Sequence, residues 1–132
     1  MDYNRRQIAI SYKSIEDGSQ ILKYFSAMEL FFCIIFILQD YSYGLYTMIL
    51  FSYIGNNGCR FLNMTYLKLY SIYLACSCLY YLILFYIDTD NECIYCIFAA
   101  IIHLFMLYLT ILVRIECKRL KIILRIINHQ QQ

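Results

Sequence analysis

The sequence predicts an all-α integral membrane protein, built as a four-helix up-down bundle with an amphipathic C-terminal helix. Hydrophobic residues make up 62 % of the 132 residues and charged residues 15 %, whereas about a quarter of a soluble domain is charged. Such a chain has more apolar side chain than a soluble core of its size buries. The apolar residues are gathered in four stretches without a period of two, which favours membrane helices over strands.

Residues 1–23 are predicted to form a polar N-terminal segment on the inner side of the membrane. Its apolar positions fall near one helical stripe, formed by Ile8, Tyr12, Ile15 and Leu22. The segment is therefore either a surface helix or a partly ordered tail. We expect Gly18 and Ser19 to interrupt any helix here, and Ser19 to cap the helix that follows.

The membrane bundle is predicted over residues 24–113, with spans at about 21–39, 42–57, 68–87 and 93–113. A spanning helix needs about 20 apolar residues, and the third and fourth stretches meet this requirement. The first does so only if it begins near Ile21, with Lys23 extending to the surface. The second is eroded by polar residues at 55–58, so a re-entrant hairpin of the first two stretches is the alternative.

The placement of charge supports four spans and one orientation. With four spans, all 11 Lys and Arg residues fall on one face of the membrane, while the short opposite loops carry Asp40, Asp88, Asp90 and Glu92. The positive-inside rule then places both termini on the cytosolic or matrix-equivalent side. The shortness of the first two spans favours a thinner internal membrane, of the endoplasmic reticulum, the Golgi or the mitochondrial inner membrane.

Two polar residues lie at depth within the predicted spans. Glu29 is the one acidic residue of a span, and His103 lies at the middle of the fourth. Both are expected to face the bundle interior, because a charge facing lipid is costly. Their depths differ by about 6 Å at a rise of 1.5 Å per residue, so contact is direct or through water. Glu29 and His103 are therefore either a polar pair that fixes helix register or part of a proton or cation relay.

Residues 114–132 are predicted to form a basic amphipathic helix and tail on the inner side. One helical face carries Arg114, Lys118, Lys121 and Arg125. The helix either lies on the inner leaflet or continues past the fourth span. Its basic face is a candidate for binding lipid or a partner subunit, and the alternative is an ordinary positive anchor that fixes topology.

Cysteines are expected to be free thiols that fill space. Cys59 and Cys117 lie at the inner membrane edge beside basic residues and are candidates for S-palmitoylation. The C-x-x-C sequence at 93–96 lacks the βαβ setting of a redox motif. The acidic run at 88–92 is interpreted as a solvated turn between two spans. No metal site and no cofactor is predicted.

The sequence favours a non-catalytic role, as an accessory subunit of a membrane complex or as a scaffold or trafficking component. Its expected partners are the bilayer and other membrane subunits or copies of itself, and the net charge of +2 gives no field to attract nucleic acid. The first alternative is a proton or ion transport element that uses Glu29 and His103. The second is a membrane enzyme that acts on lipid, with His103 or the acidic turn as its site.

Overall fold

The computed structural model describes residues 2–38, 44–87 and 93–130. These residues form four helices and no strand: α1 (Asp2–Leu38), α2 (Gly44–Phe61), α3 (Met64–Ile87) and α4 (Cys93–Gln130). The predicted all-α class with four helices is therefore confirmed for the described residues. Asp40 and the acidic run at 88–92 lie outside them.

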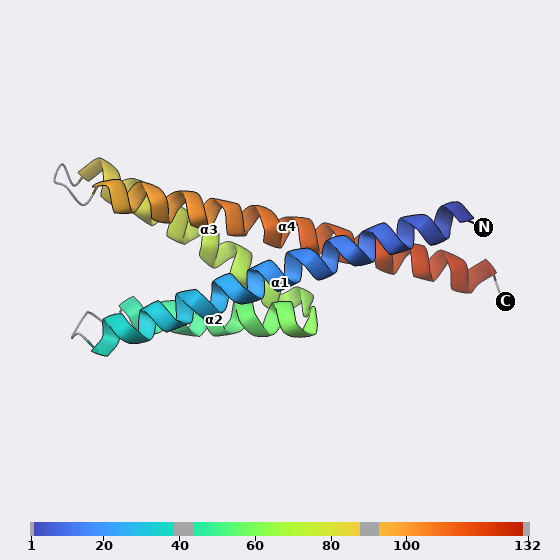
Figure 1. Cartoon of the computed structure of the whole chain (residues 1–132), viewed down its shortest axis with the longest axis horizontal. Coiled ribbons are helices and arrows are strands. Elements are labelled where there is room, and N and C mark those ends of the chain that lie inside the picture. Colours follow the sequence, from blue (N-terminus) through green and yellow to red (C-terminus); the bar gives the residue numbers. More distant parts are fainter. Residues whose placement is uncertain (1, 39–43, 88–92, 131–132) are drawn as a thin grey trace.

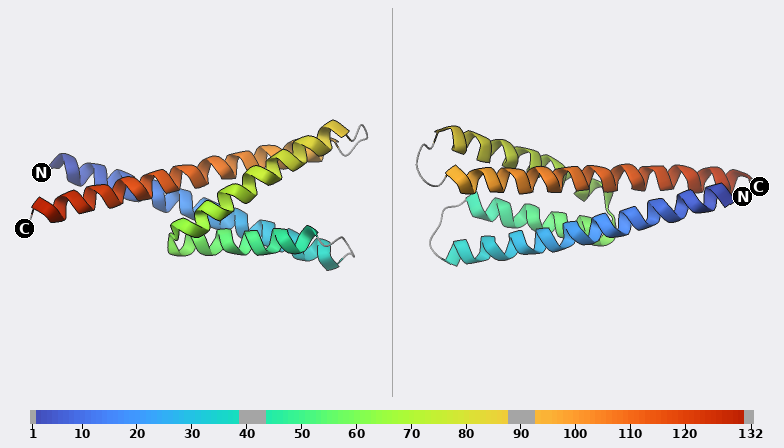
Figure 2. Two further views of the ribbon diagram at one scale, coloured as in Figure 1. Left: turned by 180° about the vertical axis from the view of Figure 1, so that it is seen from behind. Right: turned by 45° about the horizontal axis from the view of Figure 1, so that its top comes forward.

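The helices are arranged as two antiparallel hairpins. Each helix packs against the next one in the chain and α1 also packs against α4, whereas the described parts of the diagonal pairs α1–α3 and α2–α4 have no backbone contact. Figure 1 shows the α1–α2 hairpin and the α3–α4 hairpin spreading apart toward the end of the molecule where α1 and α3 end and α2 and α4 begin, with the start of α1 and the end of α4 together at the opposite end. Figure 2 shows the same divergence from behind. The hairpins are therefore held together over the part of the bundle nearer the termini.

Helix α1 runs through Gly18 and Ser19 without a break, so the interruption expected there is wrong. The Ser19 hydroxyl donates to the carbonyl of Glu16 at 3.0 Å and caps no helix. A glycine inside a helix costs about 1 kcal/mol relative to alanine. The packing of α1 on α4 offsets this cost, because a Cβ atom at Gly18 would lie 2.8 Å from Cγ2 of Val113. The glycine thus marks the close crossing of the two long helices.

Helix α4 is likewise continuous, so the basic C-terminal segment extends the fourth helix rather than forming a separate one. Val113 is fully buried, and Cys117 and Leu120 pack against the core cluster beyond it. With 37 residues in α1 and 38 in α4, both helices are about 55 Å long at 1.5 Å per residue. Both are therefore longer than the roughly 30 Å hydrocarbon core of a bilayer.

Two helices in the described ranges are long and apolar enough to cross a membrane, one over Met64–Ile87 and the other over Ile94–Ile127. They correspond to the third and fourth stretches, which met the length requirement in the sequence. In their most apolar windows only 22 % and 33 % of the residues are buried inside the protein. A core helix of a soluble protein is mostly buried, so the exposed apolar faces of α3 and α4 need another cover.

The turn between α2 and α3 is closed by backbone and side-chain hydrogen bonds. The Asn63 amide donates to the Gly58 carbonyl at 3.0 Å, and Leu62 adopts a positive φ of 49°, which together form a Schellman motif. The Asn63 side-chain oxygen accepts from the amides of Thr65 at 3.0 Å and Tyr66 at 3.5 Å. Asn63 is thus the N-cap of α3.

Replacing Asn63 by alanine is expected to destabilise the protein by about 1 kcal/mol, because the first amides of α3 lose their side-chain acceptor. Asn63→Asp is the matched control, since aspartate also caps helices, and it should stay near the parent. Unfolding by denaturing detergent in mixed micelles measures both. Equal stability of the alanine and aspartate variants would show that the cap contributes nothing.

Candidate functional site

The centre of the bundle holds a carboxylate bound by side chains from two other helices. Glu29 of α1 accepts hydrogen bonds from the Tyr73 hydroxyl at 2.7 Å and the Tyr70 hydroxyl at 3.2 Å, both on α3. Its Oε1 atom also lies 3.3 Å from Nε2 of His103 on α4. The structure therefore brings together the two polar residues singled out in the sequence. We call Glu29, Tyr70, Tyr73 and His103 the central polar cluster.

The hydrogen bonds of His103 determine how many protons the pair holds. Nδ1 lies 2.7 Å from the Ala99 carbonyl oxygen, which can only accept, so Nδ1 carries a proton. The contact between Nε2 and Glu29 then contains one shared proton, because an unprotonated nitrogen facing a carboxylate would be repulsive. The pair is neutral overall whichever atom carries that proton. It is also well enclosed, with side chains 10 % exposed for His103 and 13 % for Glu29.

Helix α2 approaches the cluster through small and polar residues. Ser52 is fully buried, and its hydroxyl makes no hydrogen bond of standard geometry in the described structure. Ser26 lies one helical turn before Glu29 on α1. The Asn56 side-chain amide of α2 donates to the Ser26 hydroxyl at 3.3 Å and to the Lys23 carbonyl at 3.1 Å. These contacts add a polar link between α1 and α2.

Aromatic packing fixes the two tyrosines of the cluster. The Tyr73 ring stacks on Phe51 of α2 with a centroid distance of 5.0 Å and an interplanar angle of 3°. The Tyr70 ring covers Gly55 so closely that a Cβ atom there would lie 2.6–2.7 Å from three ring atoms. Gly55 therefore lets α2 and α3 approach and directs the Tyr70 hydroxyl toward Glu29.

Sequence reasoning missed Tyr70 and Tyr73 as partners of Glu29. With 15 tyrosines in the chain, their number made each one uninformative. A usable signal was present, since these residues are spaced i, i+3 on the helix that follows the Gly55–Gly58 segment. An inward carboxylate requires donors, and tyrosines on one helical face are among the few donors that a span offers.

Replacing Tyr73 by phenylalanine should destabilise the protein by about 1.5–3 kcal/mol, because a hydrogen bond to a charged or proton-sharing partner is lost at a buried site. Tyr80→Phe is the control, since Tyr80 is 59 % exposed on the same helix and should change stability by less than 0.5 kcal/mol. Detergent-induced unfolding measures both variants. If the two variants were equally stable, the hydrogen bond from Tyr73 to Glu29 would contribute nothing to stability.

The four basic residues predicted on one face of the C-terminal helix do not share one environment. Lys118, Lys121 and Arg125 are exposed. Arg114 is half-buried, and its guanidinium donates to the Ser71 hydroxyl of α3 at 3.4 Å. Its Nε atom is buried without a hydrogen-bond partner. Arg114 therefore belongs to the boundary between α3 and α4.

The two cysteines predicted for lipidation are both covered to some degree. Cys59 is 4 % exposed and packs in the core, and burial raises the pKa of its thiol to about 12. Cys117 is half-buried against the same core. Acylation of Cys59 would therefore require α2 to move away from its neighbours, and acylation of Cys117 would require less movement.

The small residues of α3 and α4 serve close packing in the described structure. Cys78 lies against α4, where its thiol donates to the Ala100 carbonyl at 3.6 Å, while Cys76 points outward and is exposed. The side chain of Cys93 in the C-x-x-C sequence is outside the described part. No group of three or more His, Cys, Asp or Glu side chains that could hold a metal ion occurs among the residues searched.

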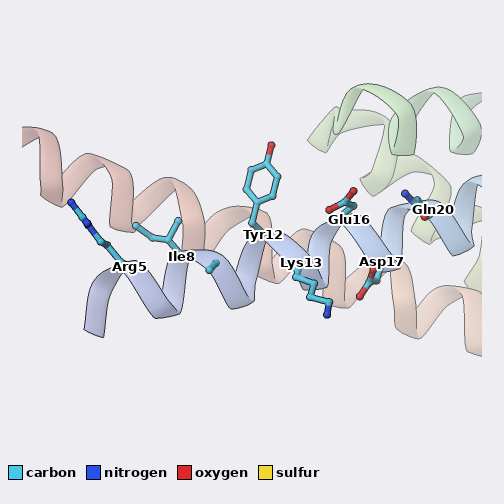
Figure 3. A pocket seen from close by; sticks show the side chains of 8 residues that line it. Arg5, Ile8, Tyr12, Lys13, Glu16, Asp17 and Gln20 are labelled. Atoms are coloured by element: carbon cyan, nitrogen blue, oxygen red, sulfur yellow. The ribbon is translucent and has the colours of Figure 1, made fainter. Parts of the chain in front are cut away.

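A surface hollow on α1 is not a candidate active site. All eight residues that line it come from this one helix, from Arg5 to Gln20, and Figure 3 shows them along it. A hollow formed by one helical face is open to its surroundings and encloses no reacting group. The central polar cluster, formed by side chains of three helices, is therefore the candidate site.

No protein-family model matches the chain, and neither does a curated protein or a solved structure. Function must therefore be inferred from the arrangement of its own residues.

Proposed function

We propose that the chain is a multi-pass integral membrane protein in which all four helices cross the bilayer. The observation that carries this proposal is the low burial of α3 and α4 despite their apolar composition. Their exposed large side chains include Leu79, Ile83, Phe98, Ile101 and Leu104. In water this surface would be far larger than the apolar patches that soluble monomers expose. Lipid tails cover it without requiring a partner along its whole length.

Helices α1 and α2 enter the same bilayer in this proposal because they share the interior of the bundle with α3 and α4. Glu29 on α1 is bound by α3 and α4 at the level where both are apolar. If α1 lay outside the membrane, its carboxylate would not lie beside a histidine at the middle of the apolar part of α4. The basic residues then lie with both termini on the cytosolic or matrix-equivalent side, and an internal membrane is favoured.

Within the membrane, we assign the chain a non-catalytic role as an accessory subunit, scaffold or trafficking component. Support comes from the central polar cluster, whose side chains bind one another: Glu29 is engaged by Tyr70, Tyr73 and His103. A reacting acid or base instead needs contact with a substrate. A neutral pair bound on several sides suits a device that sets the register of helices.

Purification of the tagged chain in a gentle detergent, followed by mass spectrometry, tests this role. An accessory subunit should co-purify with a fixed set of stoichiometric membrane partners. The same partners should co-purify with the Tyr80→Phe variant. If the chain emerged alone or only as a homo-oligomer, the accessory role would be wrong.

A proton or ion transport element is the second candidate, and the 3.3 Å contact between Nε2 of His103 and Oε1 of Glu29 is the observation that favours it. Proton flux into vesicles that contain the purified chain separates the two roles. A relay should lose its flux in Glu29→Gln and keep it in Glu16→Gln, whose parent residue is exposed on α1. Absence of flux in the parent protein would exclude the relay.

A further inference from the structure

The boundary between α3 and α4 contains an arginine that bonds across it. The Ser71 hydroxyl donates to the Leu67 carbonyl at 2.7 Å and accepts from Arg114 at 3.4 Å. The Arg114 Nε atom is enclosed by the protein and has no partner in the described structure. Arg114 as a whole is only half-buried. The part of its side chain that is exposed at this boundary is therefore open to a ligand.

Helical register places two lysines on either side of this arginine. Lys68 is one turn before Ser71 on α3, and Lys118 is one turn after Arg114 on α4, so each is a neighbour on its helix surface. Because α3 and α4 are antiparallel and Ser71 faces Arg114, Lys68 and Lys118 lie at the same level across the boundary. Both are exposed. Lys121, also exposed, follows one turn further along α4.

The acidic residue nearest to Arg114 along α4 does not neutralise this group. The Glu116 carboxylate accepts a hydrogen bond from Arg119 at 3.0 Å, and two residues of helix rotate it about 200° away from Arg114. Lys68, Arg114 and Lys118 therefore form a cluster of positive charge. We call these three residues with Ser71 the α3–α4 cationic cluster.

We propose that the α3–α4 cationic cluster binds the phosphate of an anionic phospholipid at the inner boundary of the membrane. Arginine presents a planar set of donors that matches phosphate oxygens, and lysines add charge around it. Basic residues between membrane helices on the inner side are suited to phospholipid headgroups. The cluster lies at the end of the apolar part of both helices, which is the depth of the headgroups. This inference rests on the proposed membrane location and is independent of the accessory role.

The same chemistry would accept a free phosphate or a phosphate monoester from the aqueous side. The flanking surface favours a lipid as the source, because Ile72 and Ile111, exposed by 55 % and 42 %, continue the outer faces of α3 and α4 into the apolar layer. An acyl chain attached to the bound phosphate would lie along such surfaces.

Native mass spectrometry of the full chain in detergent tests the proposal, with phosphatidylglycerol and phosphatidylcholine of the same acyl chains as probes. We expect phosphatidylglycerol to bind at least tenfold more tightly than phosphatidylcholine. Each basic residue near an anionic group contributes a factor of about five, so Lys68→Gln with Lys118→Gln should weaken phosphatidylglycerol binding about 25-fold. Arg114→Gln should weaken it at least fivefold.

The matched control removes the same charge elsewhere, as Arg5→Gln with Lys13→Gln on the exposed surface of α1, and should change binding less than twofold. The lysine variants are at exposed positions, so their folding is not in question and a loss of binding reports the α3–α4 cationic cluster. Equal binding of the two lipids, or an equal loss in the control, would overturn the proposal. Displacement of the lipid by millimolar inorganic phosphate would keep the phosphate site but overturn its assignment to a lipid.

Discussion

Replacing His103 by leucine is expected to destabilise the bundle by about 3 kcal/mol. The substitution leaves the Glu29 carboxylate enclosed without the group that shares its proton, and breaking a buried pair in this way typically costs about 3–5 kcal/mol. The Nε2–Oε1 distance of 3.3 Å and the low exposure of both side chains place the pair in this class. Detergent-induced unfolding of the purified chain, followed by circular dichroism, measures the change.

A double-variant cycle separates the pair from the general effect of changing two interior residues. Glu29→Leu combined with His103→Leu removes both polar groups, and the combined loss should be at least 1 kcal/mol smaller than the sum of the single losses. Glu16→Gln on the exposed side of α1 is the control and should change stability by less than 0.5 kcal/mol. Strict additivity would mean that Glu29 and His103 do not interact.

Replacing Gly55 by leucine is expected to have the second large effect, a destabilisation of about 3 kcal/mol or more. A Cβ atom at this position already lies 2.6–2.7 Å from the Tyr70 ring, so a leucine forces α2 and α3 apart or displaces the ring. Overpacking alone costs about 1–3 kcal/mol, and displacement of Tyr70 also removes its hydrogen bond to Glu29. The same unfolding assay measures the loss.

A compensating substitution tests this packing argument directly. Tyr70→Ala removes the ring that the leucine would strike, so Gly55→Leu should cost at least 1 kcal/mol less in a Tyr70→Ala background than in the parent. Gly55→Leu with Leu79→Ala is the control, because Leu79 is exposed on α3 and should give no rescue. A cost that did not depend on residue 70 would contradict the contact.

The all-α class and the two helices that are long and apolar enough to cross a membrane could be predicted because both depend on composition and length, which are local properties of the chain. The depth estimate for Glu29 and His103 also used only the rise of a helix, and the structure places the two side chains 3.3 Å apart. The cost of a charge facing lipid placed both side chains in the bundle interior. Their partners Tyr70 and Tyr73 could not be predicted, because which residues of a third helix meet Glu29 depends on how the two hairpins cross.

The local signal that failed was outweighed by tertiary packing. Gly18 and Ser19 resemble a helix break in isolation, but Val113 fills the space beside Gly18 and α1 remains continuous. Arg114 lies by register on the basic face of the C-terminal helix and also reaches Ser71 on α3. In both places the contacting residue is far away in the sequence.

The side of the membrane on which residues 39–43 lie tests the four-span topology most directly. If α1 and α2 cross the bilayer, an epitope inserted between Tyr41 and Ser42 will be on the opposite side from epitopes at both termini. Protease digestion of sealed and detergent-opened vesicles locates each epitope, and an insertion at Thr89 serves as the reference for the outer side. Our account predicts that the epitopes at 41–42 and 89 are protected together while both termini are cleaved. If the 41–42 epitope is cleaved with the termini, only α3 and α4 cross the membrane and the proposed topology is wrong.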